Sequence, residues 1–136
     1  MSALHLTDTV ARSLLEHADG ESPLECCGLL AGRDDSVDRS YPLTNASEWP
    51  ERRYFAEPGE LIAAFRSIRE EGRKLLGIYH SHPFSSPTPS TVDIREAHYP
   101  HCIYVIIAPA GWSPRLHGFR LDGGKVSRVS LTIHGA

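Results

Sequence analysis

Two histidines one residue apart, His80 and His82, are the side chains in this sequence whose types and spacing most directly suggest chemistry. They end the apolar segment 74–82, which reads as a strand. Residues i and i+2 of a strand point to the same face, with Cα atoms roughly 7 Å apart. Both imidazoles could then bind one zinc ion at about 2.0–2.1 Å. A chain with 8 histidines can also contain such a pair by chance, so a loop without metal remains an alternative.

Asp93 could supply a third ligand to the same ion. The loop before it contains Pro83, Pro87 and Pro89, each of which fixes its own φ and keeps the preceding residue extended. This stiff loop can hold a fixed path from the strand end to a helix that begins near Ser90. Three protein ligands and an open position for water form the catalytic type of zinc site. Ser90 and Asp93 also fit a capping box, so helix capping alone could explain both residues.

A metal-activated water also needs a carboxylate that takes its proton and later delivers it to the leaving amine. Glu25 is the candidate, because it directly precedes the apolar segment 26–31, which reads as a strand buried on both faces. At such a strand end, a neighbouring strand could present the two histidines. A glutamate at a strand entrance is also a common solvated end residue. Three other acids could compete for the role: Glu57, Glu60 and Glu96.

The elements that must position these side chains follow from hydrophobic periodicity and from turn residues. We expect helices over 7–18, 58–71 and 91–98, with Thr7 or Asp8 as the cap of the first. We expect strands over 26–31, 37–45, 52–57, 74–82, 102–108, 115–122 and 125–133. This order, α-β-β-β-α-β-α-β-β-β, predicts an α/β fold: a single-domain sandwich over residues 1–136, with a mixed sheet flanked by helices.

Composition excludes several classes of protein. The chain has 136 residues, 40% hydrophobic and 23% charged, as in an ordinary globular protein. A net charge of −3 offers no basic field for nucleic acid or for a membrane surface. We see neither a secretory leader nor a membrane-spanning run. Three cysteines, Cys26, Cys27 and Cys102, suggest no disulfide framework and fit no zinc-finger pattern, so we expect a cytoplasmic protein.

Taken together, Glu25 and the segment HSHPFSSPTPSTVD resemble the JAMM, or MPN-plus, metalloprotease family. The family pattern is an upstream glutamate, then H-[ST]-H-P, six residues, S, two residues and D. The segment 80–93 matches it at every position, and ECCGLLAG resembles the family's first core strand, E-x-C-G-L-L-x-G. The order and length of the elements match over essentially the whole chain, which implies the JAMM/MPN fold, similar to that of cytidine deaminase.

The resemblance implies a role for each residue of the pattern. His80, His82 and Asp93 would bind one Zn²⁺ per chain. Glu25 would act as general base and then general acid on a zinc-bound water, and Ser90 would hydrogen-bond the developing oxyanion or the water.

The resemblance also implies a substrate. Family members hydrolyse peptide or isopeptide bonds after the C-terminal tail of ubiquitin or ubiquitin-like proteins. This chain lacks the long insertions of eukaryotic members and is similar to the stand-alone prokaryotic members. Their partners are expected to be ubiquitin-fold sulfur carriers that end in Gly-Gly, released from an amino acid, a short extension or a lysine. The segment 41–49 is a candidate sheet edge to which such a tail could add.

Two other classes of function remain open. The first is an MPN-type interaction scaffold without activity, although such modules generally lack the ligands. The second is a zinc hydrolase of a small amide substrate, with Trp49, Tyr54 and His98 either lining a cleft or simply packing. Zinc nucleobase deaminases use H-x-E with P-C-x-x-C, and neither string occurs in this sequence.

Overall fold

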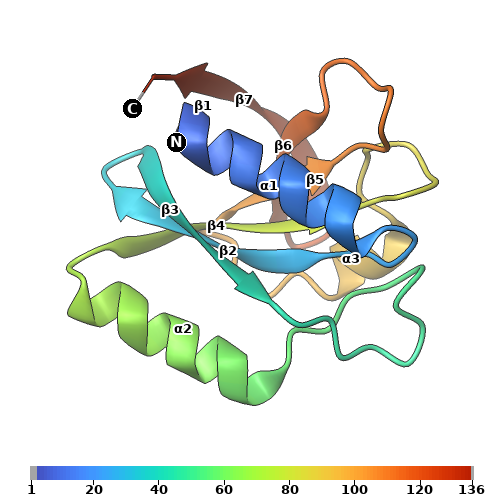
Figure 1. The fold of residues 1–136 in the computed structure, drawn as a ribbon, viewed down its shortest axis with the longest axis horizontal. Coiled ribbons are helices and arrows are strands. Elements are labelled where there is room, and N and C mark those ends of the chain that lie inside the picture. The colour runs from blue at the N-terminus through green and yellow to red at the C-terminus, as the bar shows by residue number, and fades with distance from the viewer. Residues whose placement is uncertain (1–2, 136) are drawn as a thin grey trace.

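The computed structural model describes residues 3–135, in which seven strands form one curved sheet and three helices lie outside it (Figure 1). The strands are β1 (Ala3–Thr7), β2 (Cys27–Arg33), β3 (Ser36–Leu43), β4 (Lys74–Ser81), β5 (Ile103–Ile107), β6 (Leu116–Asp122) and β7 (Lys125–His134). The helices are α1 (Asp8–Glu21), α2 (Pro58–Glu70) and α3 (Thr91–Arg95). No helix in the described range is long and apolar enough to cross a membrane.

The sheet is mixed and closes on itself in the order β1-β3-β2-β4-β5-β6-β7. β4 and β5 are parallel, while β2 is antiparallel to both β3 and β4. Closure comes from β1, which runs parallel to β7 along its whole length and parallel to β3 only through His5–Ser36 and Leu6–Val37. The predicted α/β fold with a mixed sheet flanked by helices is therefore confirmed.

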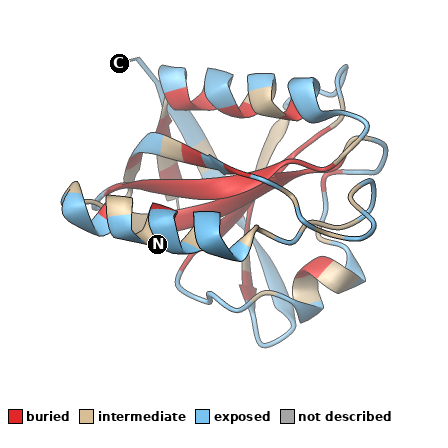
Figure 2. Cartoon of the chain, turned by 60° about the horizontal axis from the view of Figure 1, so that its bottom comes forward, coloured by how far each residue is buried: buried red, intermediate tan, exposed pale blue. Residues whose placement is uncertain are grey.

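The core has two layers, because side chains alternate between the faces of each strand. Helix α1 packs on one layer, which includes Leu14, Leu30 and Tyr79. Helix α2 contributes Ala64 and Ile68 to the other layer. Figure 2 shows the central strands almost wholly buried and the helices buried along a single stripe. By this alternation His80 lies on the face that α2 covers, since its neighbour Tyr79 belongs to the opposite layer.

Two of the predicted elements differ from the structure. Strand β1 was not expected, because its five residues run directly into α1 without a turn signal, and Thr7 is both its last residue and the helix N-cap. The strand predicted over 52–57 is wrong. Only the bridge between Asn45 and Ala56 forms there, because backbone groups of Arg53 and Phe55 bond to the Asn45 side chain instead of to a strand.

Candidate active site

The three predicted metal ligands meet where β4 ends and α3 begins. The Nε2 atoms of His80 and His82 lie 3.1 Å apart, and each is 3.1 Å from Oδ2 of Asp93. All three residues are buried. His80 belongs to β4, His82 follows that strand directly, and Asp93 lies in the first turn of α3. The three residues thus form a group that could hold a metal ion.

Local hydrogen bonds orient two of these ligands. The Nδ1–H of His82 donates to the carbonyl of Ser86 at 2.8 Å, because a carbonyl can only accept, and this leaves Nε2 free to bind a metal. The backbone N–H of His82 donates to Ile107 of the parallel strand β5 at 3.0 Å. Asp93 is held by the capping box that its spacing from Ser90 predicted, with both hydrogen bonds present.

The donor set fits a metal ion of the zinc type. Two imidazole nitrogens and one carboxylate oxygen match the composition of three-ligand catalytic zinc sites. Three atoms 3.1 Å from one another can all reach one ion at about 2.0–2.1 Å. Without a cation, protons on the histidines take its place beside Asp93. Burial disfavours the charged form of Asp93, but the charge of His80 and hydrogen bonds from the protonated imidazoles of His80 and His82 outweigh it and hold the Asp93 pKa far below its usual range. A bound metal ion would replace these protons.

Glu25 reaches this group through the register of two antiparallel strands. Cys27 pairs with His80, and continuing the same register places Glu25 opposite His82. The contact between the two segments extends one pair further, because the N–H of Ser81 donates to the carbonyl of Cys26 at 3.1 Å and the Ser81 hydroxyl accepts from the Cys26 N–H at 2.8 Å. Glu25 and His82, the next residues, line the same hollow. Directly opposite residues have Cβ atoms about 4.5–5.5 Å apart on the same face. The two segments are 55 residues apart in sequence.

Glu25 is also buried, at 5% exposure, and its Oε1 has no hydrogen-bond partner among the described residues. Burial raises the pKa of Glu25 from 4.5 to about 8, with His82 opposing the shift and Asp93 adding to it. A carboxylate whose pKa lies near neutrality is well matched to accept and return a proton. The predicted base therefore has no evident structural task that would compete with a chemical one.

Ser90 faces the same hollow as Glu25 and His82, together with Arg52 and Phe84. Its hydroxyl oxygen accepts the Asp93 N–H at 3.0 Å. The hydroxyl hydrogen is not used in that bond, so it can donate to a molecule in the hollow.

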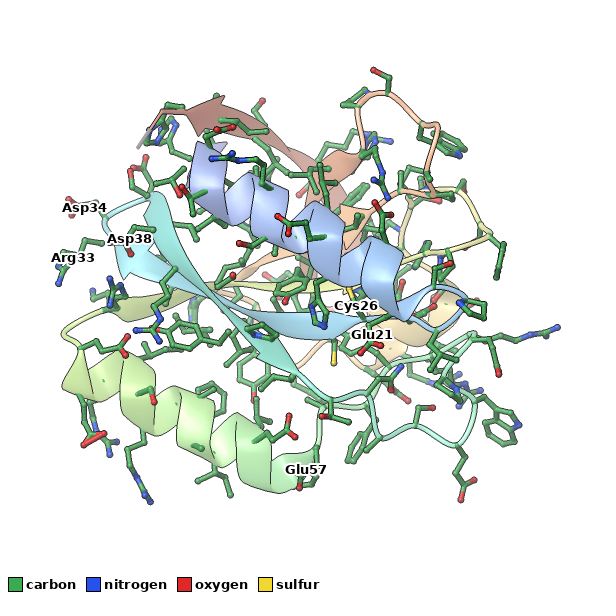
Figure 3. The ribbon with its side chains drawn as sticks, viewed as in Figure 1. Glu21, Cys26, Arg33, Asp34, Asp38 and Glu57 are labelled. Atoms are coloured by element: carbon green, nitrogen blue, oxygen red, sulfur yellow. The ribbon has the colours of Figure 1, made fainter. Side chains whose placement is uncertain are left out.

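The other three acids have different partners. Glu57 caps α2 by accepting from the N–H groups of Gly59 and Glu60, and Figure 3 labels it at the start of that helix. Glu60 accepts two hydrogen bonds from Thr44. Glu96 borders a cavity rather than the hollow that contains Glu25.

That cavity, about 500 Å³ and mainly apolar, lies beside the metal ligands. Tyr54 and His98, two of the residues expected to line a cleft or to pack, are in its wall. Tyr54 does more than that, because its ring stacks on the His80 imidazole with centroids 4.4 Å apart and planes 24° apart. No sequence signal identified this contact, since Tyr54 lies in an irregular loop far from His80 in the chain. Trp49 is 57% exposed and belongs to neither the cavity nor the hollow.

The raised pKa of Glu25 predicts how stability depends on pH in the metal-free protein. Folded Glu25 keeps its proton up to a pKa of about 8, whereas the unfolded chain loses it near 4.5. Unfolding therefore releases a proton between these values, and raising the pH favours unfolding. We expect metal-free Glu25→Gln to be more stable than the metal-free wild type, by a margin that grows through this window. Denaturant unfolding in chelator at about pH 5 and about pH 9 measures the margin; an equal margin at both would contradict the burial argument.

Comparison with known proteins identifies the family of this chain. Residues 7–118 match the family model described as prokaryotic homologs of the JAB domain. The chain is 36% identical to a desampylase of Haloferax volcanii, over 97% of both chains. It is 43% identical to a probable TtuB-protein conjugate cleaving protease of Thermus thermophilus, over 91% of this chain and 81% of that one. It is 31% identical to the CysO-cysteine peptidase of Mycobacterium tuberculosis, over 91% and 86%.

Solved structures agree as well. A protein of Desulfitobacterium hafniense superposes with a TM-score of 0.84 at 31% identity, over 98% of this chain and 94% of that one. A JAB1/MPN domain protein of Archaeoglobus fulgidus, 20% identical, shares the fold with a TM-score of 0.63, over 98% and 99%. The resemblance carried by the histidine, serine and aspartate pattern is thus confirmed, and the chain belongs to the prokaryotic JAB-domain branch of the JAMM/MPN family.

Proposed function

We propose that this chain is a zinc metallopeptidase that hydrolyses the peptide or isopeptide bond after the C-terminal Gly-Gly of a ubiquitin-like, sulfur-carrier type of protein. One observation carries the proposal: the buried carboxylate of Glu25, which has no hydrogen-bond partner within residues 3–135, shares a hollow with His82 beside three metal-binding atoms. The named relatives support the substrate class, since they are a desampylase, a TtuB-conjugate cleaving protease and a CysO-cysteine peptidase.

In the proposed mechanism His80, His82 and Asp93 would hold the ion. Zinc bound there would supply a Lewis acid that polarises the scissile carbonyl and lowers the pKa of water toward about 7. Glu25 takes a proton from the attacking water while the oxygen of that water bonds to the carbonyl carbon. The Ser90 hydroxyl donates a hydrogen bond to the oxyanion that forms. Glu25 then delivers the proton to the leaving nitrogen, the C–N bond breaks, and the products are a carboxylate and an amine.

The approach of the substrate tail is the second part of the proposal. Beyond Val37, the outer edge of β3 pairs with no strand of the described chain, so an extended tail could add to it through main-chain hydrogen bonds. This edge includes Tyr41 and Leu43, the first part of the segment 41–49 that the sequence indicated. Residues 44–49 themselves form a loop.

We further propose that residues 1–136 act as one metalloprotease domain and that the protein is cytoplasmic. The three cysteines are free and buried, which supports a reducing compartment. The complete set of donors and the buried Glu25 weigh against a scaffold without activity, because a scaffold has no use for a buried carboxylate that finds no hydrogen-bond partner among the described residues.

The proposed function is tested with ubiquitin-like proteins that end in Gly-Gly followed by a short extension or a single amino acid. Incubation with the zinc-loaded protein should remove everything after the second glycine, which mass spectrometry detects as a fixed mass loss. A carrier whose Gly-Gly is changed to Ala-Ala is the matched control and should stay intact. An unchanged mass for every Gly-Gly carrier tried, with zinc bound, would contradict the proposal. Cleavage of a small amide alone would favour the alternative hydrolase.

A further inference from the structure

The loop between β3 and α2, residues 44–57, is organised by one side chain, that of Asn45. Its Nδ2 donates to the carbonyls of Glu25 at 3.0 Å and Arg53 at 2.9 Å, with Pro50 a longer third contact at 3.4 Å. Its Oδ1 accepts from the N–H groups of Ser47 and Phe55, both at 3.0 Å. The amide has two N–H hydrogens and two lone pairs, so this network uses its full hydrogen-bonding capacity.

The first consequence concerns the backbone of Glu25. Strand β2 begins at Cys27, so Glu25 precedes the regular pairing of the sheet. Its carbonyl accepts from Asn45, and its N–H donates to the carbonyl of Pro50 at 2.7 Å. Both backbone hydrogen bonds of the proposed base therefore go to the loop that Asn45 organises. A side chain can keep a fixed direction only if its own backbone is held, because rotation of φ or ψ would swing the carboxylate away from His82.

The second consequence concerns the His80 ligand. In metal-binding histidines, the N–H of the second ring nitrogen usually donates a hydrogen bond to a partner that fixes the ring. The Nδ1 of His80 has no such partner within residues 3–135. Its ring is instead covered by Tyr54, stacked at 4.4 Å. Tyr54 lies between Arg53 and Phe55, the two loop residues whose backbone groups Asn45 binds. Asn45 thus also holds the ring that orients His80.

We propose that Asn45 is a positioning residue of the active site. Through one hydrogen-bond network it holds the backbone of the base Glu25 and the loop whose Tyr54 ring orients the ligand His80. The inference rests on the proposed function for its kinetic readout, whereas its readout by metal affinity does not depend on any substrate. It concerns a loop residue outside the histidine, serine and aspartate pattern, and one that never touches the reacting atoms.

The first test is Asn45→Asp, which keeps the shape and the acceptor oxygen but removes the two donors and brings a charge toward three carbonyls. We expect kcat for cleavage to fall by about 10–100-fold while KM stays within about threefold, because binding of the carrier does not use this network. Glu60→Ala is the matched control. It frees Thr44, the neighbour of Asn45, from two hydrogen bonds but removes no contact to Glu25 or Tyr54, so kcat should stay near the wild-type value.

The second test needs neither activity nor an intact Asn45. Tyr54→Leu removes the ring from His80, whereas Tyr54→Phe keeps the stack. Competition for zinc with a chromogenic chelator should show about 10–100-fold weaker binding for Tyr54→Leu and near wild-type binding for Tyr54→Phe. Asn45→Asp should also weaken zinc binding.

The outcomes separate the two proposals. If the wild type cleaves no carrier, the proposed function fails, and the zinc competition still decides the role of Asn45 and Tyr54. Wild-type kcat and zinc affinity in folded Asn45→Asp, or an equal loss in Glu60→Ala, would overturn the inference. Thermal unfolding checks that each variant is folded. Should Asn45→Asp not fold, equal zinc affinity of Tyr54→Leu and Tyr54→Phe would overturn it.

Discussion

Glu25→Gln is expected to lower kcat for cleavage of a Gly-Gly carrier by about 10²–10⁴-fold, the usual contribution of a positioned general base. Glutamine has the size of glutamate but cannot take a proton from water or return one to the leaving nitrogen. The carboxylate is buried, opposite His82 and without a hydrogen-bond partner among the described residues, so the substitution breaks no hydrogen bond that holds the fold. Zinc content and the free energy of unfolding at about pH 5 should therefore stay near those of the wild type.

The measurement is single-turnover cleavage followed by mass spectrometry, together with metal analysis of the same samples. Glu21→Gln is a suitable control, because Glu21 ends α1 close to Cys26 (Figure 3) yet lies outside the donor group. Its activity should match the wild type. Equal cleavage by Glu25→Gln and the wild type would remove Glu25 from the mechanism, and loss of zinc in Glu25→Gln would show that the carboxylate acts as a ligand instead.

Loss of a metal ligand should lower activity as strongly as loss of the base Glu25. We expect wild-type protein to bind about one zinc per chain and His82→Ala to bind almost none. One of three protein ligands disappears, and the two remaining donors cannot hold the ion against water. Activity should disappear with the metal. Removal of zinc from the wild type by a chelator should give the same inactive state, and adding zinc back should restore the wild type alone.

Metal content is measured by elemental analysis after purification without chelators. His98→Ala is the matched control, since His98 lines the neighbouring cavity and is not among the three donors. Full zinc occupancy is expected there. Zinc retained by His82→Ala, or a wild type that takes up no zinc, would overturn the assignment of the ligands.

Several parts of the site were predictable because they depend on neighbours along the chain. His80 and His82 share a face because a strand has a period of two residues. Ser90 and Asp93 form a capping box because they are three residues apart at a helix start. Sequence patterns encode such short-range geometry directly, and the same reasoning recovered most of the helices and strands to within a few residues.

The remaining parts depend on contacts between segments that are far apart in sequence. Strand β1 was missed because its role, closing the sheet between β3 and β7, is a property of its partners. The strand expected over 52–57 does not form, because Asn45 takes up the backbone groups that would have paired. Local patterns carry no information about which distant group will compete for a hydrogen bond.

The sequence by itself determined which side chains could do the chemistry: two histidines and an aspartate at fixed local spacing, and a glutamate before an apolar strand. Only the tertiary structure decided that Glu25 stands opposite His82, since the register of β2 against β4 joins residues more than 50 positions apart. Burial then raises the pKa of Glu25 to about 8, and the loop held by Asn45 lays Tyr54 on His80. These features arise from packing, and packing is a property of the whole folded chain.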